Sequence, residues 1–217
     1  MKIRGSAAAL AKRWSWGRLA NGVACLLLLL GGVAVQPAAA GEATEAMRGT
    51  IDETLKIIKD KDLKLPGRAE ERRRRLEQVV GERFDYQEMS RRALGAPWNE
   101  LADKDKEEFV ALFRKLLINS YADKIESYSG EGVQYINERT EKDYAEVRTK
   151  VLTGKVEIPL DYRLLHKGAD WRVYDVVVDG VSLVNNYRGQ FSKILRSSTF
   201  ADLVDQLRKK SDRTNAP

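Results

Sequence analysis

Few residues in this sequence stand in a pattern that is typical of a catalytic nucleophile or general base. His166, the one histidine among 217 residues, lies beside a polar hairpin loop and is predicted to be an exposed turn residue rather than a general base. Ser182 lies in the run Gly180-Val181-Ser182-Leu183-Val184, which lacks the second glycine of a nucleophile elbow, and no histidine follows it. These patterns argue against hydrolysis, and an esterase or lipase stays open as an alternative.

Two carboxylates, Asp175 and Asp179, are four residues apart near a predicted strand end. Either could orient a base or bind a cation, but we expect pairing with Arg172 or Arg188, which would fix the strand to the following helix. No group of histidine, cysteine or carboxylate residues has metal-ligand spacing, and no glycine-rich phosphate loop is present. We therefore predict no catalytic residue, no metal, no cofactor and no enzymatic activity.

The first forty residues have the three parts of a cleaved export signal. Five basic residues precede an apolar stretch, 23–35, and the small residues Ala38-Ala39-Ala40 follow it. We predict that residues 1–40 are removed and that the mature chain starts near Gly41. An uncleaved anchor is the alternative, but the apolar stretch is shorter than the roughly 20 residues that a membrane span requires.

Removal of this signal changes the interpretation of charge and cysteine content. The signal holds five of the 38 basic residues and none of the 32 acidic ones, so the mature chain is nearly neutral and gives no reason to expect nucleic acid. It also holds Cys25, the one cysteine, so the exported protein would have no disulfide and no thiolate.

Helical spacing dominates the first half of the exported chain. Apolar residues recur at three- and four-residue steps over 42–61 and 68–83, which predicts two amphipathic helices. The second helix carries four consecutive arginines, 72–75. Because one turn of helix points in all directions, we interpret this run as a solvated face rather than an anion-docking patch.

A short helix and a long one are predicted next. Asp85 is placed to cap a helix that Gly95 ends, and Asp103 is placed to cap the longest helix, 104–128. The long helix has a broad apolar face, which can bury against a sheet or against another apolar surface. For any single residue of that face, core packing is the simpler interpretation.

Period-two alternation then predicts an antiparallel hairpin. The runs 145–151 and 156–164 meet at Thr153-Gly154, and a two-residue turn there pairs Val147 with Leu160. Both apolar sets then lie on one face, and the other face is left to water.

The next strand, 170–178, is apolar on both faces, so its register is open. A two- or four-residue loop near Gly168 places Val173 and Asp175 on the shared apolar face, whereas a three-residue loop places Tyr174, Val176 and Val178 there. We favour the three-residue loop, because it keeps a carboxylate off the apolar surface.

Two helices are predicted at the end of the chain, over 187–195 and 200–207. The last residues are polar and expected to fray. The sequence therefore predicts one α+β domain over 41–210, followed by a polar tail over 211–217.

A set of short motifs resembles the MlaC-type periplasmic phospholipid-binding proteins, also called the toluene-tolerance family. The resemblance covers about residues 44–207 and depends on the ordered set rather than on any single motif. Its members are Phe84-Asp85 to Met89, Leu94-Gly95, Trp98, Phe109, Phe113, Leu116-Leu117, Tyr121, Trp171-Arg172-Val173-Tyr174-Asp175-Val176, Gly180-Val181-Ser182-Leu183, Asn186-Tyr187-Arg188 and Phe191.

The resemblance implies a curved antiparallel sheet of about four strands, wrapped by helices that enclose an apolar lipid pocket. It implies a soluble periplasmic carrier, expected to be a monomer, that shuttles phospholipid between an outer-membrane lipoprotein complex and an inner-membrane ABC transporter with its MCE-domain subunit. Such transport would maintain outer-membrane lipid asymmetry. A branch of the family that carries hopanoid-type lipids, and a non-catalytic binding or assembly module with a solid core, remain alternatives.

The apolar side chains suffice for a pocket or for a solid core, and the resemblance favours a pocket. Because two acyl chains must be enclosed, we expect an apolar cavity larger than a drug-sized site of about 300–1,000 Å³. The predicted lipid-binding residues are Phe84, Met89, Leu94, Trp98, Phe109, Phe113, Leu116, Leu117, Tyr121, Val147, Val151, Ile158, Leu160, Tyr162, Tyr174, Val176, Val178, Val181 and Leu183.

Overall fold

The structure is a computed structural model that describes residues 41–213 apart from 129–131 and 155. The predicted export signal, residues 1–40, and the last four residues of the predicted tail lie outside the described residues. All described elements fall within one compact unit, residues 39–217. None of the described helices combines the length and the apolar character that a bilayer crossing requires.

The helices lie close to their predicted positions. Asp85 is the N-cap of α3, because its Oδ1 accepts a hydrogen bond from the Glu88 backbone N–H at 3.0 Å. Asp103 is not a cap, because the Ala102 carbonyl accepts the first helical bond, from Lys106 N–H at 3.1 Å. The helices are α1 (Glu42–Lys59), η1 (Asp62–Lys64), α2 (Ala69–Arg83), α3 (Tyr86–Leu94), η2 (Ala96–Glu100), α4 (Asp103–Glu126), α5 (Leu183–Leu195) and α6 (Phe200–Arg213).

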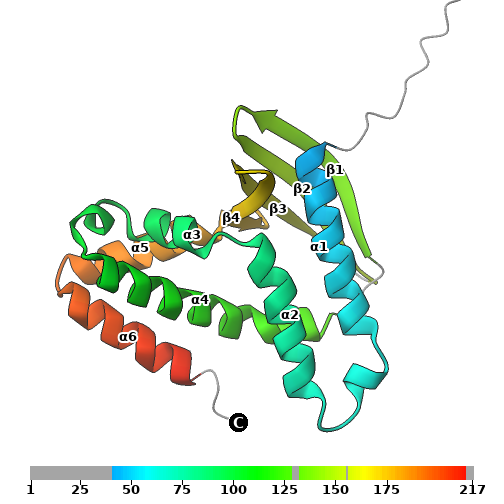
Figure 1. Ribbon diagram of the computed structural model, residues 1–217, viewed down its shortest axis with the longest axis horizontal. Helices are drawn as coiled ribbons and strands as arrows, with labels where there is room; N and C mark the ends of the chain where they lie inside the picture. Colours follow the sequence, from blue (N-terminus) through cyan, green and yellow to red (C-terminus); the bar gives the residue numbers. More distant parts are fainter. Residues whose placement is uncertain (1–40, 129–131, 155, 214–217) are drawn as a thin grey trace, which may run out of the picture. The chain divides into compact units, whose positions relative to one another are not determined.

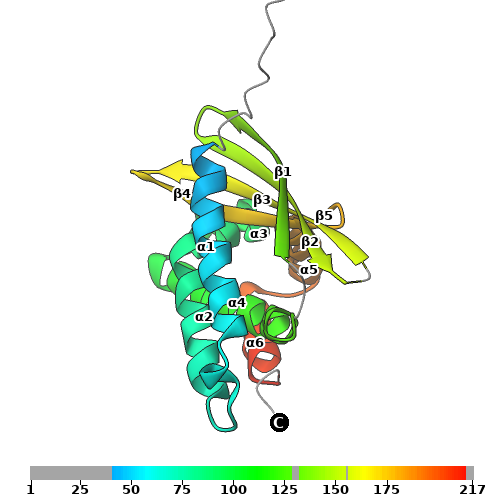
Figure 2. The ribbon, with the colours of Figure 1, turned by 90° about the vertical axis from the view of Figure 1, so that its right-hand side faces the viewer.

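The strands form one antiparallel sheet in which each strand pairs with its neighbour in sequence, in the order β1-β2-β3-β4-β5. The predicted α+β class and curved antiparallel sheet are confirmed, and helix α1 lies across one face of the sheet (Figures 1 and 2). The fifth strand has two residues, too few to show alternation in the sequence. The strands are β1 (Gly132–Glu141), β2 (Tyr144–Thr153), β3 (Val156–Lys167), β4 (Asp170–Val178) and β5 (Val181–Ser182).

The hairpin between β2 and β3 has the predicted face but not the predicted register. Thr153 pairs with Val156, so the pair that closes the hairpin lies one position later in each strand than predicted. Val147 consequently lies opposite Tyr162, two residues beyond its predicted partner. A shift of two residues is one full period of side-chain alternation, so the apolar set still shares one face.

A bulge in β4 resolves the register after residue 168. The connection is the two-residue turn Gly168-Ala169, so the predicted three-residue loop is wrong. The pairing shifts within β4, so Val173 before the bulge and Val176 after it both face the same side as the apolar residues of β3. Asp175 lies opposite Arg163 and faces away from that surface. The bulge therefore keeps the carboxylate off the apolar face, as the loop was expected to do.

The described core has two main parts. One is a helical cluster built around Phe109 and Phe113, to which α3, α4, α5 and α6 contribute. The other lies between α1 and the sheet and is built around Val147, Val173 and Met47. The two parts meet at Phe84, which packs against both.

The last helix is longer than predicted. In Figure 1, α6 runs beside α4, and it continues to Arg213, into the predicted polar tail. Ser211 is buried there, and its backbone carbonyl accepts a hydrogen bond from the Asn119 side-chain amide at 2.8 Å. Because this buried bond fixes the last turn of the helix, residues 209–213 do not form a frayed end.

Candidate functional site

A cavity of about 340 Å³ lies between the inner face of the sheet and helices α1, α2, α3 and α4. Its walls are mostly aliphatic and aromatic. The volume is at the lower end of the range for drug-sized sites, about 300–1,000 Å³, so the expectation of a larger cavity is wrong for this conformation. The reason is that the aromatic side chains of the helical cluster fill the space beside one half of α4.

Helices supply one side of the cavity wall. Met47, Ile51, Leu55 and Ile58 follow each other at four- and three-residue steps along α1, so they form one apolar stripe. All four residues line the cavity; Met47, Ile51 and Leu55 pack with the sheet, whereas Ile58 packs in a cluster with Leu76 of α2. Further apolar and aromatic lining residues on helices are Leu76 and Val80 of α2, Tyr86 and Met89 of α3, Leu117, Ile118, Tyr121, Ala122 and Ile125 of α4, and Leu183 of α5.

The sheet supplies the opposite side. Val151 of β2, Leu160 and Tyr162 of β3, and Val176 and Val178 of β4 line the cavity. They point to one side because Tyr162 pairs with Val176, and alternate residues of a strand share a face. Without the β4 bulge, Val176 would point away from the side that Val173 faces, so this wall depends on the bulge.

Charged residues line the cavity where α2 meets the end of α4. Glu126, the last residue of α4, is 2.6 Å from Arg72 and 3.8 Å from Arg73, measured between the nitrogen and oxygen of each pair. The interpretation of residues 72–75 as a solvated face is therefore wrong for Arg72 and Arg73, which join two helices. Their side chains are less than a third exposed, because this part of the helical turn faces α4.

Two tyrosines of the cavity wall, Tyr86 and Tyr162, stay protonated at neutral pH. Burial raises the pKa of Tyr86 to about 12 and raises the pKa of Tyr162 above its ordinary range. Neither phenol can therefore act as a base near pH 7. Within the residues that the structure describes, no group of three histidine, cysteine or carboxylate side chains is placed to hold a metal ion.

The residues considered for chemistry have structural partners. The Ser182 hydroxyl donates to Asp175 Oδ2 at 2.6 Å and accepts from the Asn185 N–H at 3.0 Å, so it caps α5. Asp175 also accepts from the Val184 N–H at 3.0 Å and from Arg163 at 3.1 Å. The expected pairing of Asp175 with Arg172 or Arg188 is therefore wrong, although the carboxylate does connect the strand to the next helix.

His166 is not the exposed turn residue that was predicted. It lies within β3, is partly buried, and its ring centroid is 4.9 Å from that of Trp171. This packing follows from the two-residue turn after β3, which sets the two residues opposite each other.

The structure brings about half of the predicted lipid-binding residues together at the cavity. Those that line it are Phe84, Met89, Leu117, Tyr121, Val151, Leu160, Tyr162, Val176, Val178 and Leu183. Of the remainder, Leu94, Trp98, Phe109, Phe113 and Leu116 belong to the helical cluster, Val147 to the sheet cluster, Tyr174 lines a separate hollow, and Ile158 and Val181 are exposed.

Sequence reasoning missed the part of the wall that α1 provides. The apolar stripe of Met47, Ile51, Leu55 and Ile58 was visible in the sequence, but a stripe on a polar helix is equally typical of core packing. No signal in the spacing distinguishes a stripe that meets side chains from one that faces a void.

Comparison with known proteins gives the same family by two routes. The sequence model of a family described as MlaC protein matches residues 48–209. The intermembrane phospholipid transport system binding protein MlaC of Haemophilus influenzae is 22% identical over 124 residues, which cover 54% of this chain and 58% of that protein. The matched part therefore spans less than two thirds of that relative's length. The toluene tolerance protein ttg2D of Pseudomonas putida is 22% identical over 174 residues, covering 79% of this chain and 81% of that protein.

A solved structure is similar over a larger part of the fold. It is that of the phospholipid-binding protein from Ralstonia solanacearum in complex with a phospholipid. The match has a TM-score of 0.73 and 25% sequence identity, and covers 81% of this chain and 100% of the other.

Proposed function

The chain belongs to the MlaC family, and we propose that it is a non-catalytic lipid carrier that encloses phospholipid acyl chains in the cavity between α1, α2, α4 and the sheet. The observation that carries this proposal is the cavity itself, whose walls are mostly apolar on both the helical and the sheet side. A relative with the same fold is described in complex with a phospholipid, which supports phospholipid as the cargo.

The physical need for such a cavity follows from the cargo. A diacyl lipid has on the order of 30 methylene groups, and burying each contributes about 0.8 kcal/mol. Free passage of such a lipid through water is therefore strongly unfavourable, and a carrier must replace the lost apolar surroundings. Side chains such as Leu117, Leu160 and Val176 provide these surroundings without any bond chemistry.

The charged residues of the cavity wall suggest where the head group lies. Arg73, Glu77, Lys124 and Glu126 lie on α2 and α4, whereas the lining residues of the sheet are apolar or tyrosine. Because an unpaired charge is costly in an apolar interior, we propose that the acyl chains lie against the sheet and that the head group stays near α2 and α4, towards solvent.

The names of the relatives support a wider role for this chain. We propose that it works in the periplasm and moves phospholipid between an outer-membrane lipoprotein complex and an inner-membrane ABC transporter with its MCE-domain subunit. Export by the predicted signal in residues 1–40 would deliver it to that compartment.

Lipid identification tests the cargo directly. We expect mass spectrometry of organic extracts of the purified protein to find phospholipid, and the delipidated protein to take up phospholipid from vesicles. Hopanoid-type lipid in place of phospholipid would instead place the protein in the branch of the family that carries hopanoid-type lipids. Protein that arrives without lipid and takes up none would contradict the carrier role and favour a binding or assembly module.

A matched pair of variants tests whether this cavity is the site. Val176→Glu places a carboxylate on the cavity wall, where it has no partner, so we expect uptake to fall at least about tenfold. Val181→Glu is the control, because Val181 is 59% exposed and does not line the cavity. Circular dichroism should show both variants folded. Equal uptake by folded Val176→Glu and wild-type protein would remove this cavity from the proposal.

A further inference from the structure

A second hollow, of about 530 Å³, lies on the other face of the sheet from the lipid cavity. Its floor includes Tyr174 and Asp175 of β4 and Arg163 of β3. Arg163 lies between Tyr162 and Leu164 in sequence, and both of these face the opposite side, so alternation alone separates the hollow from the cavity. The start of α5 and the segment from α3 to η2 complete its walls.

Four arginines line this hollow, and they come from three parts of the fold. Arg91 and Arg92 are on α3, Arg163 is on β3 and Arg188 is on α5. Among the residues that the structure describes, Asp175 is the one carboxylate that lines the hollow. Two further carboxylates, Glu88 and Glu146, lie within ion-pair distance of these arginines, so the group of charges keeps an excess of positive charge.

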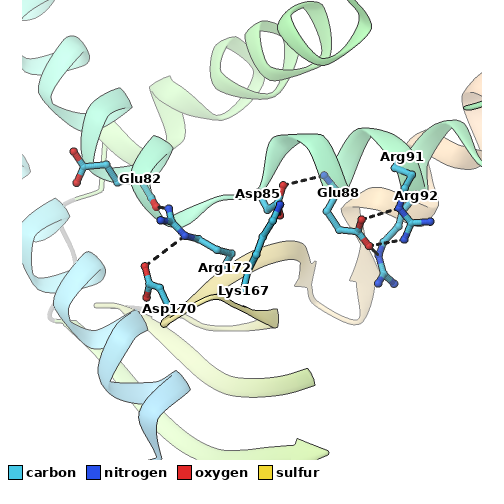
Figure 3. A network of polar contacts seen from close by, with 8 residues as sticks. All are labelled: Glu82, Asp85, Glu88, Arg91, Arg92, Lys167, Asp170 and Arg172. Atoms are coloured by element: carbon cyan, nitrogen blue, oxygen red, sulfur yellow. Dashed lines mark hydrogen bonds and ion pairs between the residues drawn. The ribbon is translucent and has the colours of Figure 1, made fainter. Parts of the chain in front are cut away.

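The carboxylates near the hollow are already occupied. Figure 3 shows Glu88 between Arg91 and Arg92, and its oxygens accept hydrogen bonds from both at 2.6–2.7 Å. Burial tends to raise the pKa of Glu88, but the hydrogen bonds from Arg91 and Arg92 outweigh burial and lower it. Glu88 is therefore a carboxylate that pairs with two guanidinium groups at once. Asp175 accepts from Ser182, Val184 and Arg163 together.

Arg188 differs from the other three arginines. In the part of the chain that the structure describes, its guanidinium has no hydrogen-bond acceptor and no carboxylate partner. Its Nε lies 3.5 Å from the point where a Cβ on Gly95 would be, and Gly95 has a φ of +74°, a conformation that favours glycine. The backbone at Gly95 therefore lets the Arg188 side chain lie close against the end of α3.

Arg92 is held in place by an aromatic ring. Its guanidinium carbon lies 4.0 Å from the centroid of the Tyr174 ring, which leaves the edge of the guanidinium to bind an acceptor. Asn99 and Asn185 add neutral donors to the wall. One planar guanidinium group can bind two oxygens of the same phosphate. A cluster of several arginines is therefore typical of a phosphate site.

From this arrangement we infer that the hollow is a second ligand site, separate from the lipid cavity, that binds the phosphate group of a small soluble anion, either inorganic phosphate or a phosphomonoester. Arg188 supplies a positive charge that none of the described side chains neutralises, and Arg91 and Arg92 complete the contact with the phosphate. The hollow is larger than one phosphate group, so it has room for an organic substituent. The inference does not depend on the lipid cargo, because the two sites lie on opposite faces of the sheet.

Isothermal titration calorimetry at low ionic strength tests the site, with inorganic phosphate and glycerol 3-phosphate as probes. We expect saturable binding of one equivalent by the lipid-loaded and the delipidated protein alike. Arg188→Gln should weaken binding at least about tenfold, because it removes a hydrogen bond to a charged group. Tighter binding of glycerol 3-phosphate than of phosphate would identify a phosphomonoester as the ligand, and the reverse would identify inorganic phosphate.

Arg196→Gln is the matched control, because Arg196 is an exposed arginine at the end of the same helix and does not line the hollow. Arg91→Gln is a second site variant, should Arg188→Gln not fold. If the control and the site variants lose equal affinity for the probes, the binding depends only on general surface charge, and the inference is overturned. No saturable binding of either probe would also overturn it, as would Arg188-dependent binding seen with phosphatidylglycerol vesicles and with neither soluble probe.

Discussion

The two halves of helix α4 have the same apolar spacing but different surroundings. In the first half, Phe109 and Phe113 are fully buried, and both rings contact Phe191 of α5, at centroid distances of 5.6 and 5.5 Å. In the second half, Leu117 and Tyr121 continue the same face but line a cavity of about 340 Å³. One helix therefore contributes to a solid aromatic cluster at one end and to a void at the other.

The difference arises from what lies opposite each half. Helices α5 and α6 bring large rings to the first half, including Tyr187, Phe191 and Phe200. Opposite the second half, the sheet brings shorter side chains such as Val151, Val176 and Val178. A void in a protein forms where facing side chains are too short to meet, and it persists only where the surrounding elements do not collapse into it. The antiparallel sheet and the α2–α4 ion pairs provide this support.

Truncation of Leu116 and of Leu117 should give the largest difference in stability between the two halves of α4. Both side chains are 6% exposed, but Leu116 packs only in the helical cluster and Leu117 borders the cavity. Truncating a buried leucine costs about 2–5 kcal/mol, and more where it creates new empty space. We expect Leu116→Ala to fall in the upper half of that range and Leu117→Ala to cost about 2 kcal/mol, measured as free energies of unfolding in urea. Equal costs would show that both halves of α4 are packed alike in solution.

Much of the fold could be predicted because its elements are marked locally. The helices show three- and four-residue spacing, and Asp85 is an N-cap in the structure as predicted. The register of β2 and β3 could be predicted only to within a full period of alternation, because a two-residue shift leaves every side chain on the same face. The bulge in β4 could not be predicted, since Asp175 is bound by Arg163 of β3 and by Ser182 and Val184 at the start of α5, and no local pattern marks these contacts.

The candidate site was harder to predict than the fold. Leu117, Val176 and Leu160 belong to faces that the sequence marks as apolar, but the same pattern includes Phe109 and Val147, which are buried in filled regions. Whether an apolar face meets other side chains or a void is decided by elements distant in sequence. Residue spacing does not show how closely those elements approach the apolar face. The family resemblance was therefore needed to predict a cavity.

A matched pair of valines extends the comparison to the sheet. Val173→Phe enlarges a side chain that is fully buried against its neighbours, and overpacking of this kind costs about 1–3 kcal/mol. Val151 lines the cavity, so the larger side chain of Val151→Phe would extend into open space. We therefore expect this variant to change the free energy of unfolding by less than about 0.5 kcal/mol. The same variant should lower the amount of lipid bound per protein. If Val151→Phe is as destabilising as Val173→Phe, the space beside Val151 is not open in solution.

Tyr86 lies on the border of the two regions. It belongs to the helical cluster, lines the cavity, and has a pKa of about 12 because of burial. A pKa raised in the folded state contributes stability that is complete below the unfolded pKa of about 10 and is lost as the pH rises through the folded pKa.

For Tyr86, the loss should reach about 1.4 kcal/mol at pH 11, which corresponds to one pKa unit. Urea unfolding of wild-type protein and Tyr86→Phe at pH 8 and pH 11 measures this difference, and the variant should lose less stability between the two pH values. Lipid in the cavity excludes water from the phenol, so loading should increase the difference. If loading leaves the pH dependence of both proteins unchanged, the lipid does not contact this part of the wall.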